Sequence, residues 1–158
     1  MTHTQTEEII LRTENQLLRF AVAILGNIED AKDVVQDTFV KLIEKQPRFN
    51  DESHEIAWLI LVAKNLCKTR LRSAKRKSCT ELLETFAADD KEQFELIELV
   101  QSLPLKYKIV IHLYYYAGYS TKEIAAMTKQ KESTVRQQMT RARELLKKYL
   151  EDTNYEKV

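Results

Sequence analysis

Residues 120–149 contain two helical patterns separated by a short polar stretch. Ser120 is followed three residues later by Glu123, the spacing of a capping box, in which each side chain satisfies a backbone N–H at a helix start. After residues 128–131, which are all polar, a second helical pattern begins. Its apolar residues recur at spacings of three and four and are Val135, Met139, Ala142, Leu146 and Tyr149. A short capped helix, a tight turn and a longer amphipathic helix predict a helix-turn-helix.

The opposite face of the second helix carries amides, hydroxyls and guanidinium groups, counted at about 100° per residue. Such groups suit a helix that lies in the major groove of DNA. The candidate DNA-binding residues are Ser133, Thr134, Arg136, Gln137, Thr140 and Arg141. The alternative is a solvated amphipathic helix in a small bundle. The capped short helix, the polar turn and the basic outer face occur together, and this combination favours DNA binding.

The chain has two Gly and two Pro in 158 residues, which leaves little turn chemistry for sheets. The sequence contains no clear strand alternation, so an all-α protein is predicted. Apolar periodicity predicts helices over 6–25, 28–44, 53–76 and 104–117, and a further helix that resumes near residue 91. Gly26 and Asn27 have the residue types of a helix end and a helix start, and Pro104 is expected to be the first residue of its helix.

The net charge of +1 hides an uneven distribution. Residues 1–80 carry 13 Lys and Arg against 11 Asp and Glu, whereas residues 104–158 carry 11 against 6. Between them, residues 81–103 carry a single Lys and seven carboxylates. Residues 78–90 are polar and weakly periodic and are the best candidate for a domain boundary. The sequence therefore predicts two small helical domains, 1–77 and 99–158, joined by an acidic linker, 78–98, with the helix-turn-helix in the second domain.

The predicted helix 53–76 has a second stripe besides its core face. This stripe begins with Trp58, becomes polar and ends basic. Residues 64–77 contain seven cations and no carboxylate, a composition that neutralises phosphates and makes binding salt-dependent. The alternative is a solvated helix end, where the helix dipole favours positive charge. Nucleic acid is the favoured partner of the basic run, whereas core packing is the favoured interpretation for Trp58 alone.

The composition argues against several functional classes. The longest strongly apolar run, 57–63, is far shorter than the ~20 residues that cross a bilayer, and the N-terminus lacks a signal-peptide pattern, so a cytoplasmic location without membrane insertion is expected. Cys67 and Cys79 form no C-x-x-C pair, and Cys67 is expected to be a reduced, half-buried thiol. The carboxylates fall on outward faces or in the acidic stretch, so no metal site, cofactor or enzymatic activity is predicted.

Three segments, in their order and spacing, resemble a bacterial extracytoplasmic-function (ECF) sigma factor of the minimal two-domain type. They are residues 26–42, 57–72 and 103–145, and the resemblance extends over about residues 17–150. The most diagnostic piece is Asp-Val-Val-Gln-Asp-Thr-Phe at 33–39. The motifs at 119–125, 134–135 and 141–143 follow it in the family's order.

The resemblance implies a promoter-specificity subunit that binds core RNA polymerase, which supplies the active site and its metal. Asp33, Gln36 and Asp37 match the surface that docks on the clamp coiled coil of the polymerase. Residues 133–141 match the reader of the −35 element, and the acidic stretch 81–98 matches a linker threaded toward the active-site channel. The element that holds the −10 region as it opens corresponds to Trp58, Lys64, Asn65, Lys68 and Arg72.

The implied partners are core polymerase, through its clamp coiled coil and flap, and promoter DNA in double-stranded and melted form. An anti-sigma factor is a further candidate partner. The alternative function is a stand-alone helix-turn-helix regulator, which would need an effector pocket or a symmetric operator.

The turn of the helix-turn-helix departs from the family pattern. Lys129 and Gln130 stand where family members commonly have Gly and an apolar residue, and Lys131 stands where a Ser commonly caps the reading helix. Because Lys is a poor N-cap, the reading helix is expected to start slightly later, at Ser133. In the first domain, Thr69 stands where an Asp is common.

Overall fold

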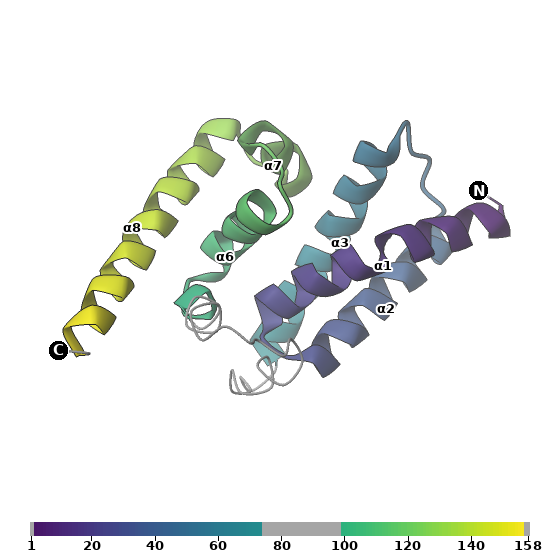
Figure 1. The fold of residues 1–158 in the computed structure, drawn as a ribbon. Coiled ribbons are helices and arrows are strands. Elements are labelled where there is room, and N and C mark those ends of the chain that lie inside the picture. Colours follow the sequence, from purple (N-terminus) through teal and green to yellow (C-terminus); the bar gives the residue numbers. More distant parts are fainter. Residues whose placement is uncertain (1, 74–98, 157–158) are drawn as a thin grey trace. The chain divides into compact units, whose positions relative to one another are not determined.

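A computed structural model of the chain describes residues 2–73 and 99–156 (Figure 1). Across these two ranges every regular element is a helix, so the all-α prediction is confirmed. The chain divides into two compact units, residues 1–82 and 83–158, here called the first and second units. The predicted linker 78–98, the end of the predicted third helix and the helix expected near residue 91 lie outside the described residues.

The first unit packs three helices against one another: α1 (His3–Leu25), α2 (Ile28–Lys45) and α3 (Glu52–Ser73). Gly26 closes α1 in the left-handed conformation, with φ 71°, which a residue without Cβ adopts at little cost. Asn27 then caps α2, because its Oδ1 accepts a hydrogen bond from the backbone N of Asp30 at 3.1 Å. Both predictions from the Gly26-Asn27 pair are confirmed.

The core of the first unit lies where the apolar rows of the three helices meet. Its fully buried members include Leu17, Phe20, Ile24, Val34, Leu42, Leu59 and Ile60. Cys67 is also fully buried, not half-buried as predicted, because it extends the row of Ala63, whose exposure is likewise zero. The position of Cys67 indicates a small core residue.

The second unit contains α6 (Leu105–Ile111), a π-helical segment η1 (His112–Tyr116), α7 (Thr121–Thr128) and α8 (Glu132–Glu156). The predicted helix 104–117 is therefore wrong in two respects. Pro104 is the capping residue and not the first helical one, since its ψ of 149° is extended. The helix also widens after Ile111, where the Ala117 N–H donates to the carbonyl of His112, five residues back, at 3.0 Å.

The turn between α7 and α8 has local explanations for its unusual residues. Lys129 adopts the left-handed conformation, with φ 54°, which explains why a Gly is suited to this position. The carbonyl of Lys131 accepts from the backbone N of Val135 at 3.1 Å, so α8 begins at Glu132 and not later at Ser133 as predicted. The Glu132 carboxylate lies in the first turn, where the helix dipole favours negative charge, and this compensates for the poor cap.

The capping box of α7 is confirmed. Ser120 Oγ accepts from the Glu123 backbone N at 3.1 Å, and Glu123 Oε1 accepts from the Ser120 backbone N at 3.0 Å. Replacing Ser120 with Ala should lower the free energy of unfolding of the second unit by about 1 kcal/mol, because a backbone donor of α7 loses its acceptor.

Urea unfolding of the full chain, followed by NMR of the buried Met127 and Met139 methyl groups, would measure this loss. Ser133→Ala is the matched control, since Ser133 is exposed near the start of α8 and its change should stay within about 0.5 kcal/mol. Equal free energies of unfolding for the two variants would contradict the capping role.

Candidate nucleic-acid interface

The outer face of α8 carries the predicted DNA-binding residues. Ser133, Arg136, Gln137, Thr140 and Arg141 are exposed and Thr134 is half-buried. Arg136 Nη2 donates to Glu132 Oε1 at 2.8 Å, and Thr140 Oγ1 donates to the carbonyl of Arg136 at 3.0 Å. Gln137 and Arg141 have no side-chain partner within the part of the chain that the structure describes. Their donors and acceptors are therefore available to a ligand.

The inner face of α8 anchors this row. Val135, Met139 and Ala142 are fully buried, which confirms the predicted apolar stripe, and Leu146 and Tyr149 are half-buried. The buried row fixes the rotation of α8 about its axis, so the polar row must face outward.

A chain of amide hydrogen bonds fastens the turn to α8. Gln138 Nε2 donates to Gln130 Oε1 at 2.8 Å, and Gln130 Nε2 donates to Thr128 Oγ1 at 2.9 Å. Thr128 in turn donates to the carbonyl of Ile124 at 2.7 Å. The polar residue Gln130 is thus accommodated in a half-buried turn because both ends of its amide have partners.

Arg143 does not belong to the outer face of α8. Its Nε donates to the hydroxyl of Tyr115 at 2.8 Å, and its guanidinium carbon lies 5.8 and 5.7 Å from the ring centroids of Tyr114 and Tyr115. These contacts lie beside an apolar groove of about 520 Å³, lined mainly by Val100, Ile111, Tyr116, Leu146 and Leu150. Sequence analysis missed this groove, and the run of three tyrosines at 114–116 is the signal that could have indicated it.

The outward stripe of α3 carries the second predicted set. Asn65, Lys68 and Arg72 are exposed, whereas Trp58 and Lys64 are half-buried. Spacings of three and four residues place this set along one side of the helix, so the stripe is continuous.

An aromatic cluster lies where α3 begins, and two of its members were not predicted. The ring of Phe49, from the loop before α3, lies edge-on to Trp58 with centroids 5.9 Å apart and to His54 at 5.5 Å. His54 Nδ1 accepts from the backbone N of Asn50 at 3.2 Å, and its own backbone N donates to Asp51 Oδ1 at 2.8 Å. Trp58 is therefore half-buried against the loop and is not a core residue.

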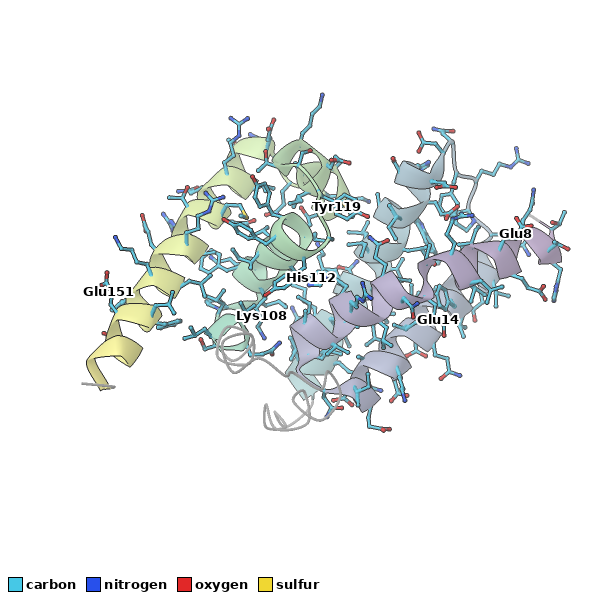
Figure 2. The ribbon with its side chains drawn as sticks, in the orientation of Figure 1. Glu8, Glu14, Lys108, His112, Tyr119 and Glu151 are labelled. Atoms are coloured by element: carbon cyan, nitrogen blue, oxygen red, sulfur yellow. The ribbon has the colours of Figure 1, made fainter. Side chains whose placement is uncertain are left out.

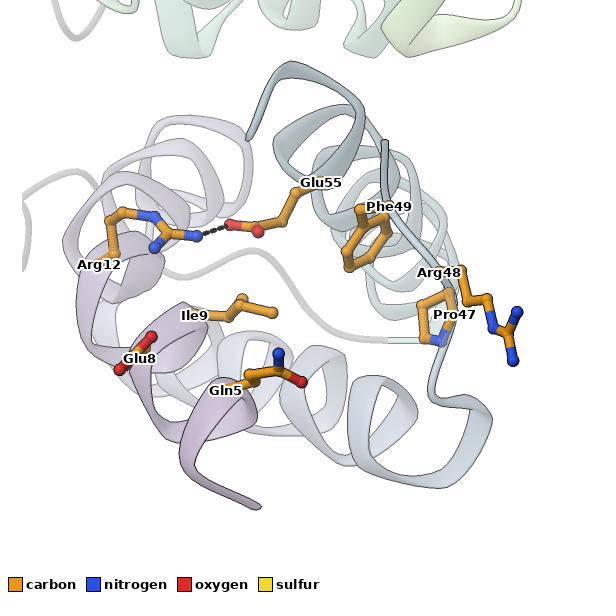
Figure 3. A pocket seen from close by; sticks show the side chains of 8 residues that line it. All are labelled: Gln5, Glu8, Ile9, Arg12, Pro47, Arg48, Phe49 and Glu55. Atoms are coloured by element: carbon orange, nitrogen blue, oxygen red, sulfur yellow. Dashed lines mark hydrogen bonds and ion pairs between the residues drawn. The ribbon is translucent and has the colours of Figure 1, made fainter. Parts of the chain in front are cut away.

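An ion pair on the other side of this loop joins α1 to the first turn of α3. Arg12 Nη2 donates to Glu55 Oε1, and Figure 3 shows the two side chains pointing toward each other at the edge of a cavity of about 430 Å³ that both line. Phe49 and Arg48 both line the cavity, and the guanidinium end of Arg48 points away from it (Figure 3). The hydrogen bond to Glu55 raises the pKa of Arg12 above its ordinary value. The pair therefore links α1 to α3 beside the loop that holds Phe49.

The outward face of α2 presents the predicted polymerase-docking residues. Asp33, Gln36 and Asp37 are all exposed. Asp33 Oδ2 accepts from Arg70 Nη2 at 3.0 Å, and Asp30 Oδ1 accepts from Arg70 Nη1 at 2.6 Å. Arg70 belongs to the basic run of α3, but its guanidinium group contacts these two carboxylates of α2.

Residues 2–73 and 99–156 contain no group of three or more His, Cys, Asp or Glu side chains that could hold a metal ion. Among the helices of these ranges, none is both long and apolar enough to cross a membrane.

Two family models match the chain in the order of its two units. The model of sigma-70 region 2 matches residues 9–77, and the model of sigma-70 region 4 matches residues 93–146. The chain belongs to the sigma-70 family of RNA polymerase sigma factors. This finding confirms the resemblance drawn from the three motifs.

Several relatives of this sigma factor are named ECF sigma factors. The ECF RNA polymerase sigma factor SigM of Mycobacterium tuberculosis is 29% identical over 149 residues, which cover 91% of this chain and 76% of SigM. A probable RNA polymerase sigma factor, RfaY of Xanthomonas campestris, is 22% identical over 85% of this chain, and the match spans 38% of RfaY. This sigma factor is therefore an ECF-type sigma factor that directs transcription initiation, and the family is not enzymatic.

The fold of this sigma factor is also found in solved structures. The sigma factor RpoE of Bartonella quintana, in complex with the anti-sigma factor NepR, aligns with a TM-score of 0.72 at 22% identity. The alignment covers 92% of this chain and 96% of RpoE. The two-domain architecture of regions 2 and 4 is thus supported by sequence and by structure.

Proposed function

We propose that the sigma factor reads the −35 element with the outer face of α8. The observation that carries this proposal is the exposed polar row, which is held outward by a fully buried apolar row. Gln137 and Arg141 lie four residues apart on one side of the helix and offer an amide and a guanidinium to base edges. Arg136 would first have to leave Glu132 before it could contact DNA.

Replacing Arg141 with Ala is expected to weaken binding to the matching promoter by about 1–3 kcal/mol and to relax selectivity at one base pair. A set of single-base −35 variants, bound by the reconstituted holoenzyme, would measure both effects. Lys148→Ala is the matched control, because it removes an exposed cation from the same helix two turns later. The control should lower affinity slightly and equally for all variants, and undiminished selectivity of Arg141→Ala would exclude the assigned role.

We also propose that the outward stripe of α3 holds the −10 strand as the duplex opens. Asn65, Lys68 and Arg72 supply polar and cationic groups to the backbone of a single strand. Trp58 and its neighbour Phe49 provide ring faces on which an unstacked base can lie, since base stacking on aromatic rings tolerates any sequence. The half-buried Lys64 extends the cationic part of the stripe.

Docking on the clamp coiled coil of core polymerase is assigned to Asp33, Gln36 and Asp37. Their exposure on one face of α2 supports this assignment. The boundaries 1–77 and 99–158 for the two domains are proposed on the sequence. The region 2 model ends at residue 77, whereas the region 4 model begins at residue 93, inside the proposed linker. The acidic stretch 81–98 is proposed to run toward the active-site channel, as the resemblance implies and as its negative charge permits.

Two further partners are proposed. The flap of core polymerase is expected to contact the second unit, as the resemblance implies. An anti-sigma factor is proposed because the structurally similar RpoE was solved with NepR. A stand-alone regulator is the other candidate function, and tight binding of the purified chain to a palindrome without polymerase would favour it.

A further inference from the structure

Arg70 stands out because it belongs to the basic run of α3 and yet contacts carboxylates of α2. Its two terminal nitrogens bind different side chains, Asp30 at 2.6 Å and Asp33 at 3.0 Å. The two carboxylates lie three residues apart, so they stand one above the other on the same side of α2. A planar guanidinium directs its two terminal nitrogens at the two carboxylates in a fixed geometry, whereas an ammonium group is a flexible point charge.

The exposure of the Arg70, Asp30 and Asp33 side chains shows which of their polar atoms a partner can still reach. The side chains of Arg70 and Asp30 are 33% and 26% exposed, and that of Asp33 is 55% exposed. Arg70 binds Oδ2 of Asp33, so the remaining oxygen of this exposed carboxylate can still accept a hydrogen bond from a partner. Asp37, one turn further along α2, has no side-chain partner in the described ranges.

We propose that Arg70 is a positioning residue of the polymerase-docking surface. It holds the Asp33 carboxylate in one orientation and connects this surface to the end of α3 that carries Lys68 and Arg72. The inference rests on the proposed docking role of Asp33. Because the guanidinium is partly buried and is also held by Asp30, it restrains the Asp33 carboxylate more than a fully exposed pair would. Without Arg70, Asp33 must lose side-chain freedom on binding, and this lowers affinity.

A double-mutant cycle on the full chain tests the proposal, with affinity for core RNA polymerase as the readout. Asp33→Asn should weaken binding about tenfold and Arg70→Met about three- to fivefold. The double variant should bind within about twofold of Asp33→Asn alone, because Arg70 acts through Asp33. Asp37→Asn is the matched control. When it is combined with Arg70→Met, the loss of affinity should equal the product of the two single losses.

The outcomes separate the proposal from the docking role on which it rests. If Asp33→Asn and Asp37→Asn both leave core affinity unchanged, the docking role fails. If these two variants weaken binding but Arg70→Met does not, the docking role stands and the positioning role is overturned. The same conclusion follows if the affinity loss of the double variant equals the product of the losses caused by Arg70→Met and Asp33→Asn. Fluorescence of Trp58, the single Trp, reports whether each variant is folded, and Arg70→Lys is a milder variant with an expected intermediate affinity.

Discussion

Replacing Arg12 with Met is expected to lower the free energy of unfolding of the first unit by about 2–3 kcal/mol. The variant removes the partner of Glu55, which is 6% exposed and would keep a buried carboxylate without its cation. Breaking a fully buried pair costs about 3–5 kcal/mol, and a loss below this range is expected here because the Arg12 side chain is 42% exposed. Urea unfolding followed by Trp58 fluorescence would measure the loss, since the only Trp of the chain lies in this unit.

Two further variants test the reason for this loss. Arg19→Met removes a cation from an exposed position on the same helix and should change stability by less than about 0.5 kcal/mol. Arg12→Met combined with Glu55→Leu should recover most of the stability, because an apolar pair leaves no unpaired charge in the interior. Equal stability of Arg12→Met and Arg19→Met would show that the ion pair contributes nothing.

Acidification from pH 6.5 to pH 4 is expected to destabilise the second unit by about 3 kcal/mol through His112. The ring of His112 is 7% exposed, stacks on Tyr116 at 5.7 Å, and lies among the helices of this unit (Figure 2). Burial lowers the pKa of His112 from 6.5 to about 4, because the charged imidazolium would lose its hydration. In this window the unfolded chain binds a proton that the folded chain does not, and each pH unit of the window costs about 1.4 kcal/mol.

The sign and range of this effect follow from the two pKa values. Above pH 6.5 the imidazole is neutral in both states and the full stability is present, and below pH 4 the loss is complete. His112→Gln stays neutral throughout, so its unfolding free energy should fall less steeply between pH 6.5 and 4 than that of the parent chain. The Met127 and Met139 methyl signals in urea would report both curves, and parallel curves would contradict the prediction.

The predictions that succeeded rest on local sequence. The capping box of Ser120 and Glu123, the helix end at Gly26 and the cap at Asn27 each depend on residues within one turn, and the structure confirms all three. The inward row of α8 was also predictable, because a spacing of three and four residues places side chains on one side of a helix whatever it packs against.

The details that were missed depend on contacts between distant parts of the chain. Arg70 lies 37 residues from Asp33, and Arg12 lies 43 residues from Glu55, so no periodicity could pair them. In the sequence, nothing distinguishes Arg70 from the other cations of the basic run, which were predicted to bind phosphates; only its contacts with α2 do so. The start of α8 differs from the prediction for another reason: Lys131 is a poor N-cap, but the Glu132 carboxylate beside it stabilises the first turn.

The most direct test of the account is transcription by core RNA polymerase reconstituted with this chain, on a library of random promoters. We expect transcripts that start downstream of a shared two-part motif. Arg141→Ala should change the upstream part of this motif, and Lys68→Ala with Arg72→Ala should reduce opening of the duplex at the downstream part. A shared motif whose upstream part is unchanged in Arg141→Ala, with undiminished opening by Lys68→Ala with Arg72→Ala, would contradict the placement of promoter reading on α8 and α3.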